Sequence, residues 1–274
     1  MINVHGGDIY THKGVIDFSA NINPLGTVPS VLKAAKESLE NIGNYPDTQC
    51  RALRQALSEK ENIDKENIIC GNGAADLIFN LVLAAKPKKA LLVTPSFAEY
   101  EQALSLTETE IQFYKLKEAN GFKLEEDYLE YLSTDIDMVF LCTPNNPTGK
   151  TIEPRLLERI ISKCEENHIL LVLDECFNDF LDQPEVYSMK DKVQIYKCIF
   201  ILKAFTKMYA MAGLRLGYGL CSNKALLEQM ERLRQPWSVS IPAQAAGVAA
   251  LAEVDLPRKT RKYIQVERER LCGI

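Results

Sequence analysis

Short apolar runs alternate with amphipathic stretches along most of this chain. Four runs are predicted to be fully buried strands and a fifth, less apolar run a further strand: residues 89–93, 138–142, 169–173, 198–202 and 216–220. Between them lie helical stretches such as residues 153–167, in which apolar residues recur on one face. Continuous apolar strands that alternate with helices predict an α/β fold, with a mostly parallel sheet covered by helices on both faces.

The two ends of the chain differ from this pattern. Residues 1–28 are rich in Gly, Asn and turn-forming residues, which predicts an arm with little regular structure. A helix is predicted to follow from Pro29 to about Glu40, because proline suits the first turn of a helix. Residues 256–271 are predicted to form one long helix, whose many charged residues most simply form a solvated face.

The composition excludes several classes of protein. The 274 residues are 46% hydrophobic and 25% charged, which suits a globular protein, and a net charge of −5 argues against nucleic acid as a partner. No apolar run approaches the roughly 20 residues that cross a bilayer, and residues 1–8 lack a signal-peptide pattern. We therefore expect a cytoplasmic protein with no membrane association. The eight cysteines and three histidines show no ligand spacing, so no metal site is expected.

One candidate phosphate site is a glycine-rich segment, residues 71–76 (Gly-Asn-Gly-Ala-Ala-Asp). It lies between the apolar residues 68–70 and an apolar helical stretch, residues 77–85. Such a context directs free backbone N–H groups and the positive end of a helix dipole toward a bound phosphate. Taken alone, the segment is better explained as an ordinary turn from a strand to a helix.

Two charged residues follow the predicted buried strands. Asp174 comes at the edge where open α/β sheets bind ligands. A protonated pyridine nitrogen would give this carboxylate a cation, although a helix cap or a surface ion pair is the simpler alternative. Lys207, preceded by Thr206, follows the next strand, and a lysine in a partly dry cationic pocket can form a Schiff base with a carbonyl. Lys203 is the rival candidate.

As a set, these segments resemble the fold-type I pyridoxal-phosphate enzymes, the aspartate aminotransferase superfamily. In that family the Schiff-base lysine follows Ser or Thr, with a glycine six residues later and a phosphate-binding arginine eight residues later. Lys207, Gly213 and Arg215 match this spacing, which rejects Lys203. The resemblance implies pyridoxal 5'-phosphate as the cofactor, with Lys207 and Asp174 as catalytic residues. The implied cofactor-binding residues are Gly73, Ala74, Ala75, Phe97, Asn146, Asp174, Thr206, Lys207, Arg215 and, across a dimer interface, Tyr45.

Segments outside the cofactor core are similar to one branch of this superfamily, the L-threonine-O-3-phosphate decarboxylases of cobalamin biosynthesis. The similar segments are residues 5–10, 16–26, 44–47, 94–100 and 234–239. Histidinol-phosphate aminotransferases are close relatives of this branch, but they usually have a tyrosine three residues after the ring-binding aspartate, where this chain has Phe177. The branch implies that His5, Asn23 and the backbone of Gly26 contact the substrate.

The resemblance also implies a domain organisation. It divides the chain into an N-terminal arm (1–28), a cofactor-binding large domain (29–255) and the start of an interdomain helix (256–274). Family members continue into a C-terminal small domain of on the order of 80–100 residues, which this sequence lacks. That domain holds the arginine that grips the substrate α-carboxylate.

Three hypotheses about function remain open from the sequence. The chain is a decarboxylase that converts L-threonine O-3-phosphate to (R)-1-amino-2-propanol O-2-phosphate, an aminotransferase of the histidinol-phosphate type, or a truncated remnant that at most binds the cofactor. The expected partners are a small amino-acid phosphate and a second copy of the chain, since Tyr45 would reach the neighbouring site of a homodimer.

Overall fold

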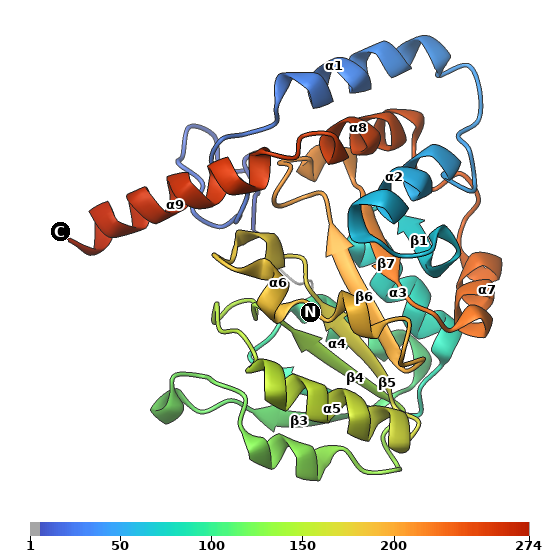
Figure 1. The fold of residues 1–274 in the computed structure, drawn as a ribbon, viewed down its shortest axis with the longest axis vertical. Helices are drawn as coiled ribbons and strands as arrows, with labels where there is room; N and C mark the ends of the chain where they lie inside the picture. Colours follow the sequence, from blue (N-terminus) through green and yellow to red (C-terminus); the bar gives the residue numbers. More distant parts are fainter. Residues whose placement is uncertain (1–5, 274) are drawn as a thin grey trace.

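The computed structural model describes residues 6–273, in which seven strands form one mixed sheet in the order β1-β7-β6-β5-β4-β2-β3 (Figure 1). The strands are β1 (Ile68–Gly71), β2 (Lys89–Thr94), β3 (Glu110–Lys115), β4 (Met138–Cys142), β5 (Leu170–Asp174), β6 (Ile199–Ala204) and β7 (Gly217–Leu220). Strands β2 to β6 run parallel to one another, and β7 is antiparallel to both β1 and β6. The predicted mostly parallel sheet is confirmed.

Helices cover both faces of this sheet, as predicted. One face packs against α3 (Ala74–Ala85), α4 (Ala98–Leu104) and α7 (Lys224–Leu233). The other face packs against α2 (Arg51–Glu61), α5 (Pro154–Glu166) and α8 (Ile241–Leu251), and α1 (Pro29–Ser38) lies on α8. A short helix, α6 (Pro184–Tyr187), follows β5, and α9 (Leu256–Cys272) projects away from the body of the molecule (Figure 1).

The alternation of side chains along the strands decides which of the two cores each residue enters. In β6, Ile201 enters the core under α2, α5 and α8, whereas Leu202 enters the core under α3, α4 and α7. In β5, Val172 belongs to that second core. Asp174, two residues after Val172, and Lys203, two residues after Ile201, therefore point to opposite faces of the sheet.

The ends of the described chain largely follow the sequence expectation. Residues 6–28 contain no helix or strand. Helix α1 ends at Ser38 and continues as a 3-10 turn, Leu39–Asn41, and α9 is a single helix as predicted. No helix of residues 6–273 combines the length and the apolar character needed to cross a bilayer. The division into arm, large domain and interdomain helix stays a prediction.

Candidate active site

A cavity of about 130 Å³ lies at the carboxyl ends of β4, β5 and β6, beside the first turn of α3. Parallel strands end at the same edge of a sheet, so loops that are far apart in the sequence converge there. Most of the residues predicted to bind the cofactor line this cavity: Ala74, Ala75, Phe97, Asn146, Asp174, Thr206, Lys207 and Arg215. The structure thus brings the separated segments together, while their contacts to a cofactor stay predictions.

One end of the cavity has the features of an anion site. Gly73 precedes the first residue of α3 with a φ of +89°, a conformation that favours glycine. A Cβ at this position would lie 2.5 Å from Nη2 of Arg215, so the missing side chain lets the guanidinium approach the helix start. Arg215 itself has a φ of +56° after the 3-10 turn Ala212–Leu214. A positive side chain and the free N–H groups of a helix N-terminus both favour a phosphate.

Asp174 contributes a buried carboxylate to the same cavity. Its side chain accepts a hydrogen bond from the Tyr100 hydroxyl (2.6 Å) and another from the Cys176 backbone N–H (2.9 Å). Among residues 6–273 it forms no salt bridge, so the charge is held by two neutral donors and is available to a cation in the cavity. Burial and the nearby Asp174 charge raise the pKa of Tyr100 well above its usual value, which keeps this hydroxyl a donor.

Tyr100 was not identified from the sequence. It lies on α4, is fully buried and stacks on Phe140 with ring centroids 4.8 Å apart. The available signal was its place one helical turn after Phe97, which predicts that both side chains lie on the same side of α4.

Lys207 lies in a turn that follows β6. Its Nζ is 5.3 Å from the centre of the Phe177 ring, over the face of that ring. Lys203, within β6, is instead buried on the opposite face of the sheet, with its Nζ 3.8 Å from Glu61 and 3.7 Å from Glu175. Of the two lysines that the sequence offered, only Lys207 lines the cavity.

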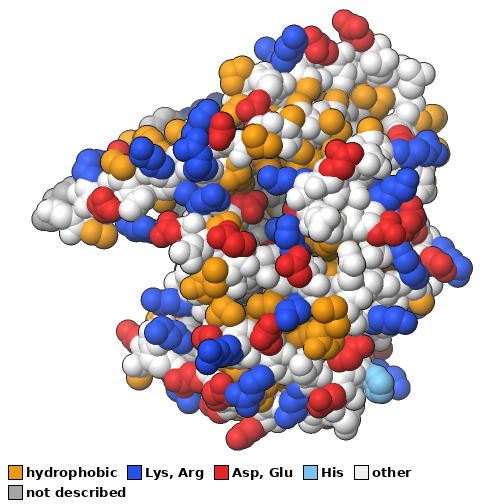
Figure 2. Space-filling view, in the orientation of Figure 1, with side chains coloured by type: hydrophobic (Ala, Val, Ile, Leu, Met, Phe, Trp, Pro, Cys, Tyr) orange, Lys and Arg blue, Asp and Glu red, His pale blue; other side chains and the backbone are white. Residues whose placement is uncertain are grey.

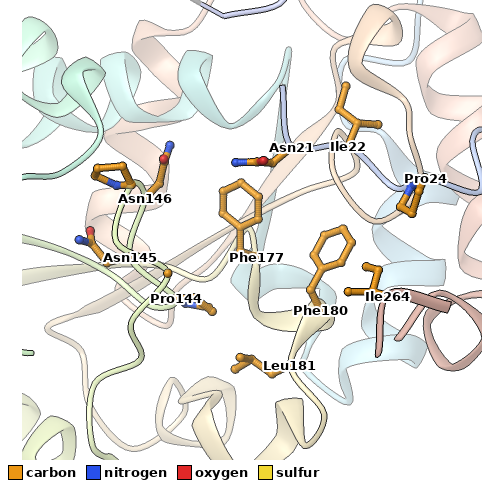
Figure 3. A pocket seen from close by; sticks show the side chains of 12 residues that line it. Asn21, Ile22, Pro24, Pro144, Asn145, Asn146, Phe177, Phe180, Leu181 and Ile264 are labelled. Atoms are coloured by element: carbon orange, nitrogen blue, oxygen red, sulfur yellow. The ribbon is translucent and has the colours of Figure 1, made fainter. Parts of the chain in front are cut away.

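A second cavity, of about 360 Å³, adjoins the first and shares Asn146 and Phe177 with it (Figure 3). Its remaining wall is mostly apolar and is formed by residues of the arm, of β4–α5 and β5–α6 loops and of α9: Asn21, Ile22, Pro24, Pro144, Asn145, Pro147, Gly149, Phe180, Leu181 and Ile264. In Figure 3 the side chain of Asn21 extends toward Asn146, near the Phe177 ring. The two cavities form one site with a polar inner part and an apolar outer part.

The residues predicted to contact the substrate do not gather at the cavity as the predicted cofactor-binding residues do. Asn23 is buried, its side-chain amide is bonded to Met208 and Thr260, and it lines neither cavity. The N–H of Gly26 donates to the Asn23 carbonyl within the arm. His5 lies outside the described residues. Asn21, two residues before Asn23 in the same motif, is the asparagine of the arm that lines the outer cavity. It was missed because spacing alone does not show which asparagine of the arm faces inward.

Tyr45 does not line either cavity. Its side chain is 78% exposed and stacks on Trp237 with ring centroids 4.5 Å apart. Contact between Tyr45 and a cofactor in a second copy of the chain stays a prediction.

Comparison with known proteins places the chain in a family. A model of the aminotransferase class I and II family matches residues 13–274. The chain belongs to this family. The threonine-phosphate decarboxylase of Salmonella typhimurium is 40% identical over 98% of this chain and 75% of its own length.

Solved structures support the same assignment. The histidinol-phosphate aminotransferase from Clostridium acetobutylicum matches 94% of this chain and 76% of its own, with a TM-score of 0.87 and 30% identity. The L-threonine-O-3-phosphate decarboxylase from Porphyromonas gingivalis matches 92% of this chain and 74% of its own, with a TM-score of 0.78 and 25% identity. The observed α/β fold is thus the one found in fold-type I pyridoxal-phosphate enzymes.

Membership of this family implies pyridoxal phosphate as the cofactor, and the described residues fit that group. Arg215 and the start of α3 suit a phosphate, and the Asp174 carboxylate suits a protonated ring nitrogen. Phe97 offers a ring face, and Lys207 offers an amine beside the same cavity. An anion site, a carboxylate and a lysine around one narrow cavity match the chemistry of this cofactor.

Proposed function

We propose that this chain acts as a threonine-phosphate decarboxylase, converting L-threonine O-3-phosphate to (R)-1-amino-2-propanol O-2-phosphate as a step of cobalamin biosynthesis. The observation that carries the proposal is the 40% identity to a threonine-phosphate decarboxylase over nearly the whole chain. A phenylalanine at position 177, which the resemblance associates with the decarboxylase branch, lines both cavities and supports it.

The chain's own residues then have distinct tasks. When bound, pyridoxal phosphate supplies an electron sink for the pair released at the substrate Cα. Arg215 and the first N–H groups of α3 would hold the phosphate, and Asp174 would keep a proton on the ring nitrogen. The Lys207 amine, beside the same cavity, would hold the proton that is delivered to the substrate Cα.

The outer cavity would decide which bond of the substrate breaks. The orientation in which the cavity residues would hold the substrate would select between loss of carbon dioxide and loss of a proton at Cα. Phe177 and Phe180, with ring centroids 6.3 Å apart, and Ile264 form an apolar wall for the substrate carbon chain. Asn21 offers an amide to a polar group of the substrate. An arginine of a small domain, which the resemblance predicts as the carboxylate grip, stays a prediction.

An aminotransferase of the histidinol-phosphate type is the second candidate. It is favoured by the TM-score of 0.87 to a histidinol-phosphate aminotransferase. The same residues serve both reactions, with Lys207 as the base that removes the Cα proton in the transferase.

One incubation separates these candidates. The purified chain is loaded with pyridoxal phosphate and given phosphothreonine, with and without an oxo-acid acceptor, beside a Lys207→Ala control. Carbon dioxide release that needs no acceptor supports the decarboxylase, and an amino product that appears only with the acceptor supports the transferase. Covalent attachment of the cofactor without turnover would contradict both activities for this chain and identify a protein that only binds the cofactor.

A homodimer is part of the proposal. The exposed Tyr45–Trp237 pair is a large aromatic surface of the kind that is often buried at interfaces. Light scattering of the chain and of Tyr45→Ala, combined with cofactor titration, tests whether Tyr45 contributes to binding across the interface. A monomeric chain that binds the cofactor with full affinity would contradict this part.

A further inference from the structure

The turn that holds Lys207 has little regular structure of its own. Residues 205–210 lie outside any helix or strand, and their own main-chain bonds are Phe205 N–H to the Leu216 carbonyl (3.1 Å) and Ala210 N–H to the Lys207 carbonyl (3.3 Å). A lysine on such a turn needs support from elsewhere, because a shift of about 1 Å at a reacting group costs much of its reactivity.

That support comes from the N-terminal arm. The backbone N–H of Asn23 donates to the Lys207 carbonyl (3.0 Å), and Nδ2 of Asn23 donates to the Met208 carbonyl (2.7 Å). The Thr27 hydroxyl donates to the Ala210 carbonyl (2.7 Å). Three carbonyls of the turn are therefore held by two arm residues.

Asn23 also connects this turn to α9. Its Nδ2 donates a second hydrogen bond to Oγ1 of Thr260 (2.8 Å), and its Oδ1 accepts one from the Leu25 N–H (2.9 Å). The orientation of the amide follows from its partners, because a carbonyl can only accept and a backbone N–H can only donate. Asn23 is 3% exposed and Thr260 is fully buried, so water cannot easily replace these bonds.

The partner on α9 is placed to act as an anchor. Leu256 and Thr260 are the buried residues of this otherwise solvated helix, whose row of Lys and Arg side chains is visible in Figure 2. One turn further along, Ile264 lines the outer cavity, and Arg261 donates to the Asp179 carbonyl (3.0 Å), close to Phe177. The face of α9 that meets Asn23 is thus the face that meets the site.

We propose that Asn23 is a positioning residue: it fixes the main chain at Lys207 and Met208 relative to the cavity, and it ties that position to α9 through Thr260. The proposal rests on the proposed function only in taking Lys207 as the lysine that attaches the cofactor. Asn23 itself would touch neither cofactor nor substrate.

Two variants probe the two halves of this arrangement. Asn23→Ala removes the side-chain bonds to Met208 and Thr260, and Thr260→Val removes the hydroxyl while keeping the side-chain size. Thr260→Ser restores the hydroxyl and serves as the conservative rescue. Asn80→Ala is the matched control, because Asn80 is also a buried asparagine whose Nδ2 donates to a main-chain carbonyl, that of Met230 (3.0 Å), away from the turn.

The first measurement is hydrogen–deuterium exchange of the chain without added cofactor. Asn23→Ala is expected to speed exchange in residues 205–210 about fivefold, the effect of losing one net hydrogen bond, and Thr260→Val about twofold. Exchange in β6 should not change, Thr260→Ser should behave as the parent chain, and Asn80→Ala should leave residues 205–210 unaffected.

The second measurement is the rate of borohydride-trapped attachment of pyridoxal phosphate across a pH series. We expect this rate to fall about fivefold in Asn23→Ala and its pH midpoint to move, while Asn80→Ala keeps both.

The proposal is overturned if Asn23→Ala and Thr260→Val lower the unfolding temperature as Asn80→Ala does but change neither exchange in the turn nor attachment. If Asn23→Ala does not fold, the comparison of Thr260→Val with Thr260→Ser tests the proposal instead. A parent chain that never traps the cofactor defeats the proposed function, while the exchange data still decide the role of Asn23.

Discussion

Lys203 and Lys207 are four residues apart in the chain but lie in opposite environments. Lys207, on an irregular turn, has its amine over the Phe177 ring at the edge of a cavity. Lys203, in the last part of β6, is 6% exposed and lies between Glu61 and Glu175. Lys207 therefore presents its amine to the cavity, whereas the amine of Lys203 is held between two carboxylates.

The Lys203 cluster is a closed set of ion pairs and hydrogen bonds. Glu61 accepts from the Tyr218 hydroxyl (2.6 Å) and pairs with Lys190 (3.2 Å). Burial alone would raise the pKa of Glu61, but Lys203, the Tyr218 hydroxyl and Lys190 together hold this pKa below its usual value. Burial by itself would lower the pKa of Lys203, because Lys203 is charged when protonated. The surrounding carboxylates, chiefly Glu61, instead raise this pKa above its usual value.

The difference shows how one fold uses buried charge in two ways. In the cluster, each charge has a protein partner, so the group is structural. In the cavity, the hydrogen-bond partners of the Asp174 side chain among the described residues are the neutral donors Tyr100 and Cys176, so this carboxylate suits a cationic ligand. Glu175, the next residue, pairs with Lys203 and accepts hydrogen bonds from the Ser188 hydroxyl and the Met189 backbone N–H. These bonds help to hold the end of β5 that presents Asp174.

The largest effect is expected at Lys207. Lys207→Ala should abolish borohydride-trapped attachment of pyridoxal phosphate and lower any turnover by on the order of a thousandfold or more, because no second lysine lines the cavity among the residues that the structure describes. Mass spectrometry of the trapped protein measures attachment. The unfolding temperature should stay close to that of the parent, and cofactor trapped in Lys207→Ala would show that another lysine is the attachment site.

Lys203→Met should act on stability instead. Removing this amine leaves Glu61 and Glu175 as buried carboxylates without their shared cation, which costs about 3–5 kcal/mol of unfolding free energy. Urea denaturation measures the loss. Lys190→Met is the matched control, because Lys190 pairs with the same Glu61 but is partly exposed, and it should cost about 1 kcal/mol or less. Equal losses in the two variants would contradict the structural role of Lys203.

Tyr100→Phe should weaken cofactor retention without unfolding the chain. The variant removes one of the two hydrogen bonds to the Asp174 carboxylate, and a bond to a charged group corresponds to roughly tenfold in affinity. Cofactor titration followed by absorbance measures the change. Tyr114→Phe is the control, since Tyr114 is also a buried tyrosine and donates to Asp127 (2.5 Å) far from the cavity. Identical cofactor affinities for Tyr100→Phe and Tyr114→Phe would show that Tyr100 does not contribute to cofactor binding.

The smallest effect is a pH dependence of stability at Glu61. Because the folded state holds this pKa below its usual value, its ionised form stabilises the fold above the unfolded pKa of about 4.3, and this contribution is lost as the pH falls through the folded pKa. The stability difference between the parent and Glu61→Gln should therefore be largest near pH 7 and shrink in acid.

Glu175→Gln is the opposite control for this measurement. Burial raises the pKa of Glu175, and Lys203 only partly offsets this rise. The folded state therefore favours the protonated carboxyl, and the parent should gain stability relative to Glu175→Gln as the pH falls. Urea denaturation at several pH values follows both, and parallel curves for the two variants would contradict the assigned directions.

The sequence predicted the buried strands better than the exposed one. Strands β4, β5 and β6 were recognised to within one or two residues, because continuous apolar runs mark strands that are covered on both faces. Strand β3 was not predicted. Among the described strands it pairs with β2 alone, and most of its residues are exposed or half-buried, so polar and apolar residues mix and no continuous apolar run marks it.

The candidate site divides in a similar way. Asp174, Lys207 and Arg215 could be predicted because each follows a recognisable element at a spacing that resembles a known family. Asn21 and Asn23 could not be assigned their places, because which asparagine of an irregular arm faces a cavity depends on contacts with residues 208 and 260. Such contacts join positions that are distant in the sequence, and no local period reports them.

By itself, the sequence determined the α/β class and a mostly parallel sheet, because these follow from the local hydrophobic period. It indicated pyridoxal-phosphate chemistry through short motifs whose spacing resembles a known family. Only the tertiary structure decided the environments of the two lysines, which the spacing of the family motif could not show. Side chains alternate between the faces of a sheet, so Lys203 enters a core where Glu61 and Glu175 neutralise it, whereas the turn after β6 carries Lys207 beyond the sheet edge to the cavity.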